Sequence, residues 1–262
     1  MRSVHFSYAQ TASQTFNAIF YNRRVFENPK SIDDIKKLVE YVTVKDDCDI
    51  ILDFFSGSAT TAHAVMQLNA EDGGHRKFIM VQLPEKCDEA SEAYRAGYKN
   101  ICEIGKERIR RAGKKIKEEN PLTTQDLDIG FRVLKCDSSN MEDVYFTPKE
   151  YMDKQQSLFV DNIKKDRSDE DLLFDAMLKL DTPLSSKIEK ITIAGKTVYN
   201  VAQGHLMACF DKNVTDEVIT AIAKEMPSYF VMRDSSQADD SVAINFEQIF
   251  NTYSPQTVRR VL

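Results

Sequence analysis

Residues 49–65 read DIILDFFSGSATTAHAV, and this stretch decides the fold of the first part of the chain. A short apolar run ends at Asp53, small residues follow, and an apolar helical pattern begins near Thr60. This order predicts a buried parallel strand, a tight turn and the start of a helix. Such a turn lets the backbone approach a ligand, and the first helical N–H groups face that ligand. We therefore expect a ligand site at the carboxyl end of this strand.

Composition narrows the class of protein. The chain has 262 residues, enough for two domains, with 42% hydrophobic and 29% charged residues, as in soluble globular proteins. No apolar run approaches the roughly 20 residues that span a bilayer, and Met1–Phe20 lacks the apolar centre of a signal peptide. The five cysteines form no CxxC pair, so we expect free thiols in a reducing cytoplasm, with neither disulfides nor a metal site.

The charge pattern argues against a surface that binds nucleic acid everywhere, because the net charge is −6. The basic stretch Lys106–Lys117 lies on a predicted helix whose isoleucines are spaced for one buried face. Its charges are therefore expected to point outward. A solvated helix face is the favoured interpretation, and contact with phosphates is the alternative.

Helices and strands alternate in the first part of the chain. This rhythm predicts a parallel sheet with right-handed crossovers. The predicted helices are 10–20, 32 onward behind the N-cap Ser31, 60–68 and 101–118; the predicted strands are 49–54, 77–83 and 130–136.

The second part has a different character and predicts a smaller α/β domain. The polar residues 145–165 are expected to connect the two, which places the domains at 1–145 and 146–262. The expected helices are those from 168, 215–225 and 242–250; the expected strands are 188–193, 197–201, 205–210 and 229–233.

The turn sequence resembles motif I of amino-group DNA methyltransferases, Asp-x-Phe-x-Gly-Ser-Gly-Thr-Thr, which binds S-adenosylmethionine. Ala59 replaces one glycine of that motif. The matching residues are Asp53, Phe55, Gly57, Ser58, Thr60 and Thr61.

Further segments resemble the modification (Mod) subunit of type III restriction–modification systems, an adenine-specific DNA methyltransferase. Phe26–Ser31 resembles its motif X, and the blocks at 68–78, 130–140 and 206–213 follow in the family's order. The resemblance covers residues 20–262. It implies a partial Rossmann-like methyltransferase sheet followed by a smaller α/β C-terminal domain. It also implies double-stranded DNA as substrate of the full-length protein, a restriction (Res) subunit as partner, a homodimer and no membrane.

The catalytic motif of this family, Asp-Pro-Pro-Tyr, is absent. The two Asn-Pro pairs, at Asn28 and Asn120, continue with other residues. In the permuted order of the family the catalytic half precedes motif X, so the chain resembles the C-terminal half of a longer enzyme. We expect no catalytic residue here and no methyl transfer by this chain alone.

The cofactor contacts implied by the resemblance extend beyond the turn. Motif X contributes three residues, and the end of the second strand contributes Gln82, where many relatives carry an acid for the ribose hydroxyls; Glu85 is the reserve candidate. The full predicted set is Phe26, Asn28, Lys30, Asp53, Phe55, Gly57, Ser58, Thr60, Thr61 and Gln82.

Several of these residues also have a purely structural interpretation. The Asp53–Gly57 segment could be a turn alone, Phe55 could serve the core, and Asn28 and Lys30 could be a helix cap and a solvated side chain. For His63, inside the helix after the turn, packing is favoured over catalysis. Asp239 and Asp240 are better explained as a solvated loop than as a cation site.

Other functions remain open at this point. The chain could be a non-catalytic module that joins subunits of the restriction–modification complex. A dinucleotide-dependent oxidoreductase is disfavoured, because Gly-x-Gly-x-x-Gly does not follow the strand. The resemblance also implies that the first strand lacks a neighbour from the catalytic half. We therefore expect its edge to be covered by Met1–Asn22 or by a second copy of the chain.

Overall fold

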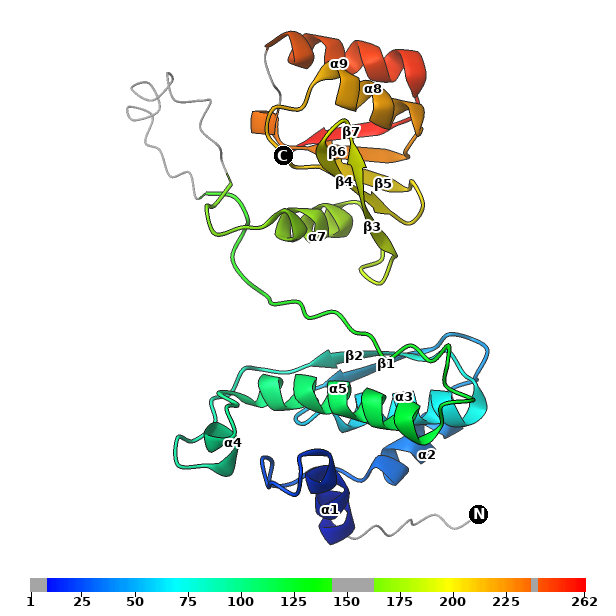
Figure 1. Ribbon diagram of the computed structural model, residues 1–262, viewed down its shortest axis with the longest axis vertical. Coiled ribbons are helices and arrows are strands. Elements are labelled where there is room, and N and C mark those ends of the chain that lie inside the picture. The colour runs from blue at the N-terminus through cyan, green and yellow to red at the C-terminus, as the bar shows by residue number, and fades with distance from the viewer. Residues whose placement is uncertain (1–8, 143–162, 237–239) are drawn as a thin grey trace. The chain divides into compact units, whose positions relative to one another are not determined.

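The computed structural model describes residues 9–142, 163–236 and 240–262. The chain divides into two compact units, residues 1–134 and 135–262 (Figure 1). The domain boundary predicted at 145–146 and Asp239 of the predicted acidic loop lie outside the described residues.

A two-stranded parallel sheet forms the centre of the first unit. Strand β1 (Ile50–Phe54) pairs with β2 (Lys77–Val81), with Asp53 opposite Met80. Helix α3 (Thr60–Asp72) connects them, as the sequence predicts, and ends at Gly73, whose φ of 70° places it in the left-handed region that glycine tolerates. The strand–turn–helix–strand order predicted for residues 49–83 is confirmed.

Four other helices of the first unit are described. Ser31 caps α2 by accepting a hydrogen bond from the Asp34 amide at 3.3 Å, as predicted from its position. The short helix α4 is the one that the sequence analysis did not predict. The helices are α1 (Ala9–Ile19), α2 (Ile32–Val42), α4 (Glu92–Arg95) and α5 (Ile101–Glu119).

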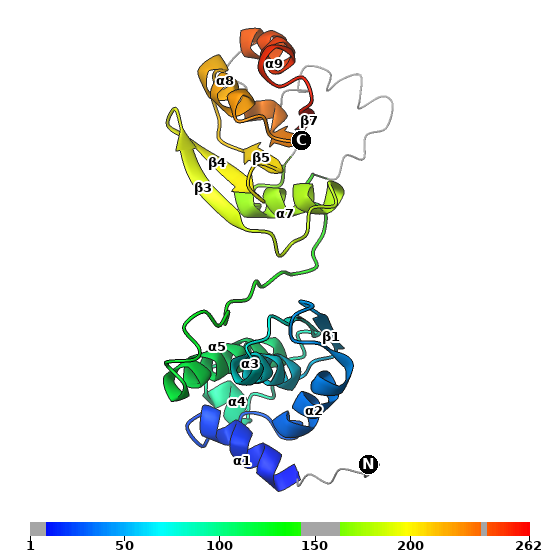
Figure 2. The same ribbon diagram turned by 90° about the vertical axis from the view of Figure 1, so that its right-hand side faces the viewer.

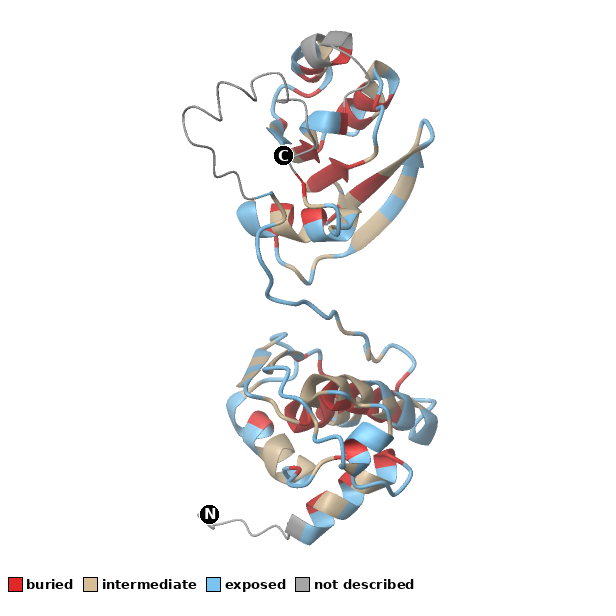
Figure 3. Ribbon diagram, turned by 90° about the vertical axis from the view of Figure 1, so that its left-hand side faces the viewer, coloured by how far each residue is buried: buried red, intermediate tan, exposed pale blue. Residues whose placement is uncertain are grey.

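One face of this sheet is covered by helices and the other is exposed. Ile51 packs with Val65 and Leu68 of α3. The alternate residues of β1 point to the opposite face, where Ile50 is 62%, Leu52 58% and Phe54 63% exposed (Figure 3). The prediction of a buried strand is thus wrong for this face, because side chains alternate along a strand and the described helices cover one side only.

The third strand predicted at 130–136 is also wrong, since these residues form no ladder. The chain before it packs on α5 instead. Gly113 has no side chain, and Ile129 fills that space: a Cβ at Gly113 would lie 2.8 Å from the Ile129 Cβ. Arg110 stacks over the Phe131 ring at 5.5 Å. Burial against the helix draws this segment away from the edge of β2.

The second unit contains a five-stranded mixed sheet in the order β3-β4-β5-β6-β7. β3, β4 and β5 pair antiparallel, whereas β5, β6 and β7 pair parallel. The last strand was not predicted. The strands are β3 (Ile188–Ile193), β4 (Lys196–Val201), β5 (Leu206–Cys209), β6 (Tyr229–Met232) and β7 (Val258–Val261).

Helices cover both faces of this second sheet (Figure 2). Helix α7 (Asp169–Lys179) lies on one face, where Leu172 packs with Leu206 and Ala208 in one core. Helices α8 (Asp216–Lys224) and α9 (Asp240–Tyr253) lie on the other. A mixed α/β unit follows the first one, as the sequence predicts. Within the described part of the chain, no helix combines the length and apolar character that crossing a bilayer requires.

Candidate functional site

The turn between β1 and α3 has an unusual backbone. Phe55, Gly57 and Ala59 have φ values of 70°, 52° and 58°. Left-handed conformations are costly for residues with a Cβ, so Phe55 and Ala59 hold strained backbone. Ala59 occupies the glycine position of motif I and is the N-cap of α3, without a side-chain capping bond. The first N–H groups of α3 therefore receive no cap from this residue.

The carboxyl end of β2 holds the turn in place. The Phe55 and Ser56 amides donate to the Val81 carbonyl oxygen at 2.9 and 3.0 Å. The Gly57 amide donates to Gln82 Oε1 at 2.7 Å. Adjacent parallel strands end at the same edge of a sheet, where α/β proteins bind ligands. The structure thus brings Gln82 and Gly57 together.

Asp53 and Thr61 form a second link across the turn. The Thr61 hydroxyl donates to Asp53 Oδ2 at 2.5 Å. This bond links the end of β1 to the first turn of α3. Both residues belong to the predicted site, and the bond leaves the second carboxylate oxygen of Asp53 as an acceptor.

Arg108 of α5 is a residue of the site that the sequence analysis missed. Its Nη1 donates to Ser58 Oγ at 2.9 Å, to Thr60 Oγ1 at 2.6 Å and to the Ser58 carbonyl at 3.3 Å. Its side chain is fully buried, so the prediction that the basic residues of this helix all point outward is wrong. The available signal was its spacing, because Arg108 lies four residues after Ile104 and four before Ala112, inside the apolar stripe.

Close packing brings α5 and the chain before α2 against the turn. Gly105 lets the helix approach: a Cβ there would lie 3.3 Å from the Gly57 carbonyl oxygen. A Cβ at Gly57 would lie 3.5 Å from Phe26 Cζ. Phe26 of the motif X segment therefore lies beside the turn, as the resemblance implies.

Three other predicted residues are exposed. Phe55 is 65% exposed and packs edge-on against Phe54, with ring centroids 5.6 Å apart. Asn28 and Lys30 are also exposed. Within the described residues they form no hydrogen bond with the turn, and their role stays a prediction.

His63 is buried one helical turn beyond Thr60. Burial, together with Arg108 and Lys115, lowers the pKa of its imidazole to about 3. A histidine that stays neutral across the physiological range and lies inside the helix packing is suited to a structural role, in line with the favoured interpretation.

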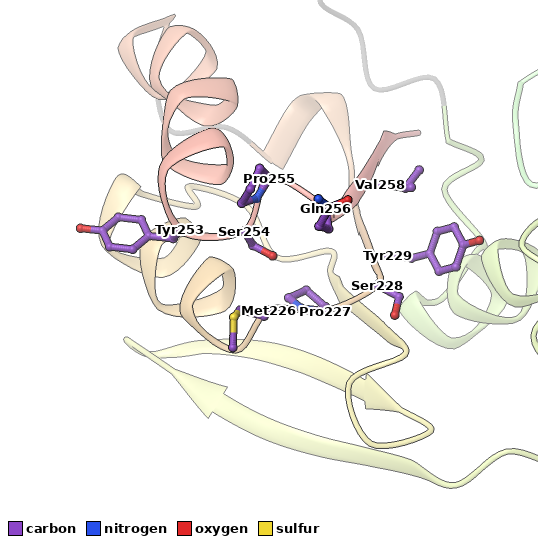
Figure 4. A pocket seen from close by; sticks show the side chains of 9 residues that line it. All are labelled: Met226, Pro227, Ser228, Tyr229, Tyr253, Ser254, Pro255, Gln256 and Val258. Carbon is purple, nitrogen blue, oxygen red and sulfur yellow. The ribbon is translucent and has the colours of Figure 1, made fainter.

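The second unit has a surface pocket of its own (Figure 4). Its volume is about 400 Å³, and it lies where β6 and β7 begin, beside Pro227 and Pro255. None of the predicted site residues lines it. The side chains of Tyr229 and Tyr253 point away from each other at its two ends (Figure 4). In the described parts of both units, no cluster of His, Cys, Asp or Glu has a metal-binding arrangement.

Comparison with known proteins shows which proteins this chain is similar to. Residues 5–114 match the family described as DNA methylase. The StyLTI Mod subunit of a type III restriction–modification enzyme from Salmonella typhimurium is 45% identical over 112 residues, or 43% of this chain and 17% of that protein.

A second relative covers more of the chain. The EcoPI Mod subunit of Escherichia phage P1, also of type III, is 32% identical over 208 residues, or 78% of this chain and 30% of that protein. An alignment of this length includes parts of both units. The Type II methyltransferase M.KpnI of Klebsiella pneumoniae is 36% identical over 97 residues, or 37% of this chain and 22% of that protein. The chain thus spans less than a third of these relatives.

These matches confirm the resemblance on which the sequence interpretation depends. The chain is similar to the Mod subunits of type III restriction–modification systems, and residues 5–114 are similar to the DNA methylase family.

Proposed function

We propose that this chain is the S-adenosylmethionine-binding portion of a site-specific DNA adenine methyltransferase from a type III restriction–modification system. The observation that carries the proposal is the turn at Gly57, fixed by Gln82 at the carboxyl edge of a parallel sheet. The similarity to Mod subunits supports it independently.

The residues at the turn fit this cofactor. The start of α3 has no side-chain cap and carries the partial positive charge of a helix N-terminus, which suits the carboxylate of the methionine part. Gly57, Ser58 and Thr60 would hold that end. Asp53 and Phe26 lie beside them and would contact the rest of the molecule. When bound, the cofactor supplies an electrophilic methyl group, and the transfer depends mainly on alignment of the reacting atoms.

We further propose that the chemistry of the reaction comes from residues outside this sequence. The motif Asp-Pro-Pro-Tyr is absent from the sequence, so we assign no residue of this chain to bind the adenine amino group. The two strands would then be part of a larger Rossmann-like sheet whose other elements cover the exposed face of Ile50, Leu52 and Phe54. The DNA substrate, the Res subunit and a homodimeric state belong to this proposal for the full-length protein in the cytoplasm. For residues 146–262 the corresponding proposal is subunit interaction.

Calorimetric titration with S-adenosylhomocysteine tests the cofactor assignment. We expect weak but measurable binding to the wild-type chain, because a complete pocket encloses most of its ligand and one wall is missing here. Gly57→Val should abolish that binding, since a β-branched residue is strained at a φ of 52°.

Gly73→Val is the matched control. Gly73 has a φ of 70° and open space around it at the other end of α3. Gly73→Val imposes the same kind of backbone strain without touching the turn. This variant should therefore bind S-adenosylhomocysteine with wild-type affinity. Unchanged binding by Gly57→Val would contradict the assignment of the turn.

A further inference from the structure

Arg108 presents a buried positive charge to the Gly57 turn without an acidic partner. Its side chain is 0% exposed. The oxygens that accept from its Nη1 are those of Ser58 and Thr60, which are uncharged. Its buried Nε has no hydrogen-bond partner in the described part of the chain, and no described carboxylate forms an ion pair with it. A buried charge is costly unless it is compensated, so this arrangement indicates an absent anion.

The surroundings keep the guanidinium in this position. The ring of Phe16 from α1 stacks on the guanidinium, with Arg108 Cζ 5.1 Å from the ring centroid. Phe16 is itself fully buried. Burial lowers the pKa of Arg108 to about 9, which leaves the group charged at neutral pH. The nearby His63 is neutral there and adds no compensating charge.

Arg108 orients the hydroxyl groups of Ser58 and Thr60 at the turn. Ser58 Oγ and Thr60 Oγ1 each accept from Nη1, so their own hydrogens are left to donate elsewhere. The positive charge also adds to that of the α3 N-terminus. Both effects favour a ligand that is an acceptor and an anion at this turn.

We propose that Arg108 is a positioning residue that selects the carboxylate of an amino-acid-bearing ligand at the Gly57 turn, acting through the hydroxyls of Ser58 and Thr60. The inference deepens the proposed function and depends on it, because the ligand is the amino-acid end of S-adenosylmethionine. A residue that only packs α5 against the turn would support the binding of all ligands equally. A positioning residue instead favours ligands that carry a carboxylate, and this difference in affinity distinguishes the two roles.

The test compares two ligands that differ by one carboxylate. S-adenosylhomocysteine and its decarboxylated analogue are titrated into the wild-type chain, Arg108→Met and Arg108→Lys. Arg108→Met leaves the two hydroxyls without their orienting donor, so one hydroxyl bond to the charged carboxylate should be lost. The affinity for S-adenosylhomocysteine should therefore fall about 10- to 100-fold, the range of one hydrogen bond to a charged group. The affinity of this variant for the decarboxylated analogue should be unchanged. Arg108→Lys keeps the charge without the planar fork and should give a smaller loss with the same selectivity.

Arg110→Met is the matched control, because Arg110 is on the same helix but exposed and pairs with Glu107 at 3.5 Å. It should bind both ligands like the wild type. Equal losses for both ligands in the Arg108 variants, or equal affinity of the wild type for both, would overturn the inference. If Arg108→Met fails to fold, judged by circular dichroism, Arg108→Lys decides. A wild-type chain that binds neither ligand would instead overturn the proposed function.

Discussion

The amide of Gly57 donates a hydrogen bond to Gln82 Oε1 at 2.7 Å, so the end of one strand fixes the turn that follows its neighbour. The Gln82 amide nitrogen donates to the Leu83 carbonyl at 3.2 Å. Gln82 thus holds the turn from the end of β2. Its predicted contact with the cofactor ribose is a separate role that these bonds do not test.

Replacing Gln82 should separate the two roles. Gln82→Leu removes the acceptor and should lower the free energy of unfolding by about 1 kcal/mol, measured by urea denaturation. Gln82→Glu keeps an acceptor for the Gly57 amide and should stay within about 0.5 kcal/mol of the wild type. Equal destabilisation by both variants would contradict a role of this bond in holding the turn.

Gly105 should matter for ligand binding more than for stability. Gly105→Ala gains about 1 kcal/mol of helix propensity but places a methyl group 3.3 Å from the Gly57 carbonyl oxygen. Because the turn is pinned by Gln82, we expect the crowding to offset the gain in stability and to weaken S-adenosylhomocysteine binding in calorimetry.

Gly113→Ala on the same helix is the control for this effect. Its added methyl group would meet Ile129 at 2.8 Å, away from the turn. It should change the unfolding free energy without changing ligand affinity. Weakened binding in Gly113→Ala but not in Gly105→Ala would refute the prediction.

His63 should make the first unit sensitive to acid. The pKa of its imidazole is about 3 in the folded chain and near 6.5 when unfolded, so the unfolded chain binds the extra proton between these values. Stability is therefore expected to fall as the pH drops from 6.5 toward 3, by about 2 kcal/mol at pH 5 from this group. Urea denaturation at several pH values should show a shallower fall for His63→Asn. His75→Asn, at an exposed histidine, should keep the wild-type slope.

The purified chain should not methylate DNA by itself. It lacks Asp-Pro-Pro-Tyr, so we expect no transfer of labelled methyl groups from S-adenosylmethionine to double-stranded DNA. Transfer by the wild-type chain that is lost in Asp53→Ala would show that the reaction does not need the missing motif. A preparation in which Asp53→Ala is equally active would point to a contaminating enzyme.

Local patterns were enough to predict most of the elements, because apolar periodicity and turn residues act over a few positions. Examples are the helix behind Ser31, the strand at 188–193, and the strand predicted at 229–233, which is observed at Tyr229–Met232. The strand predicted at 130–136 does not form, and the reason is nonlocal. Ile129, just before it, packs in the space beside Gly113 of α5.

The site was predictable only in part for a similar reason. The turn residues lie together in sequence, and their resemblance to motif I marks them. Arg108 lies about fifty residues away and reaches the turn through packing of α5. Its charge suggested a solvated position, and only its place in the apolar stripe indicated burial.

The exposed face of the first sheet yields the last prediction. Ile50, Leu52 and Phe54 are more than half exposed, and Ile79 beside them on β2 is 49% exposed. From the sequence we expect either Met1–Asn22 or a second copy of the chain over this strand. The described part of Met1–Asn22 does not lie there, since Phe16 of α1 belongs to a core with Ile104 of α5. A bare apolar surface of this kind promotes association.

We therefore expect the wild-type chain to self-associate in sedimentation velocity and to bind a hydrophobic dye. The double variant Leu52→Lys, Phe54→Lys should be monomeric and should bind less dye, with little change in unfolding free energy, because both side chains already face solvent. Ile51→Lys is the control: it points to the helix-covered face with Val65 and Leu68, and should destabilise the unit by several kcal/mol. A wild-type chain that sediments as a monomer and leaves the dye unbound would show that this face does not drive association.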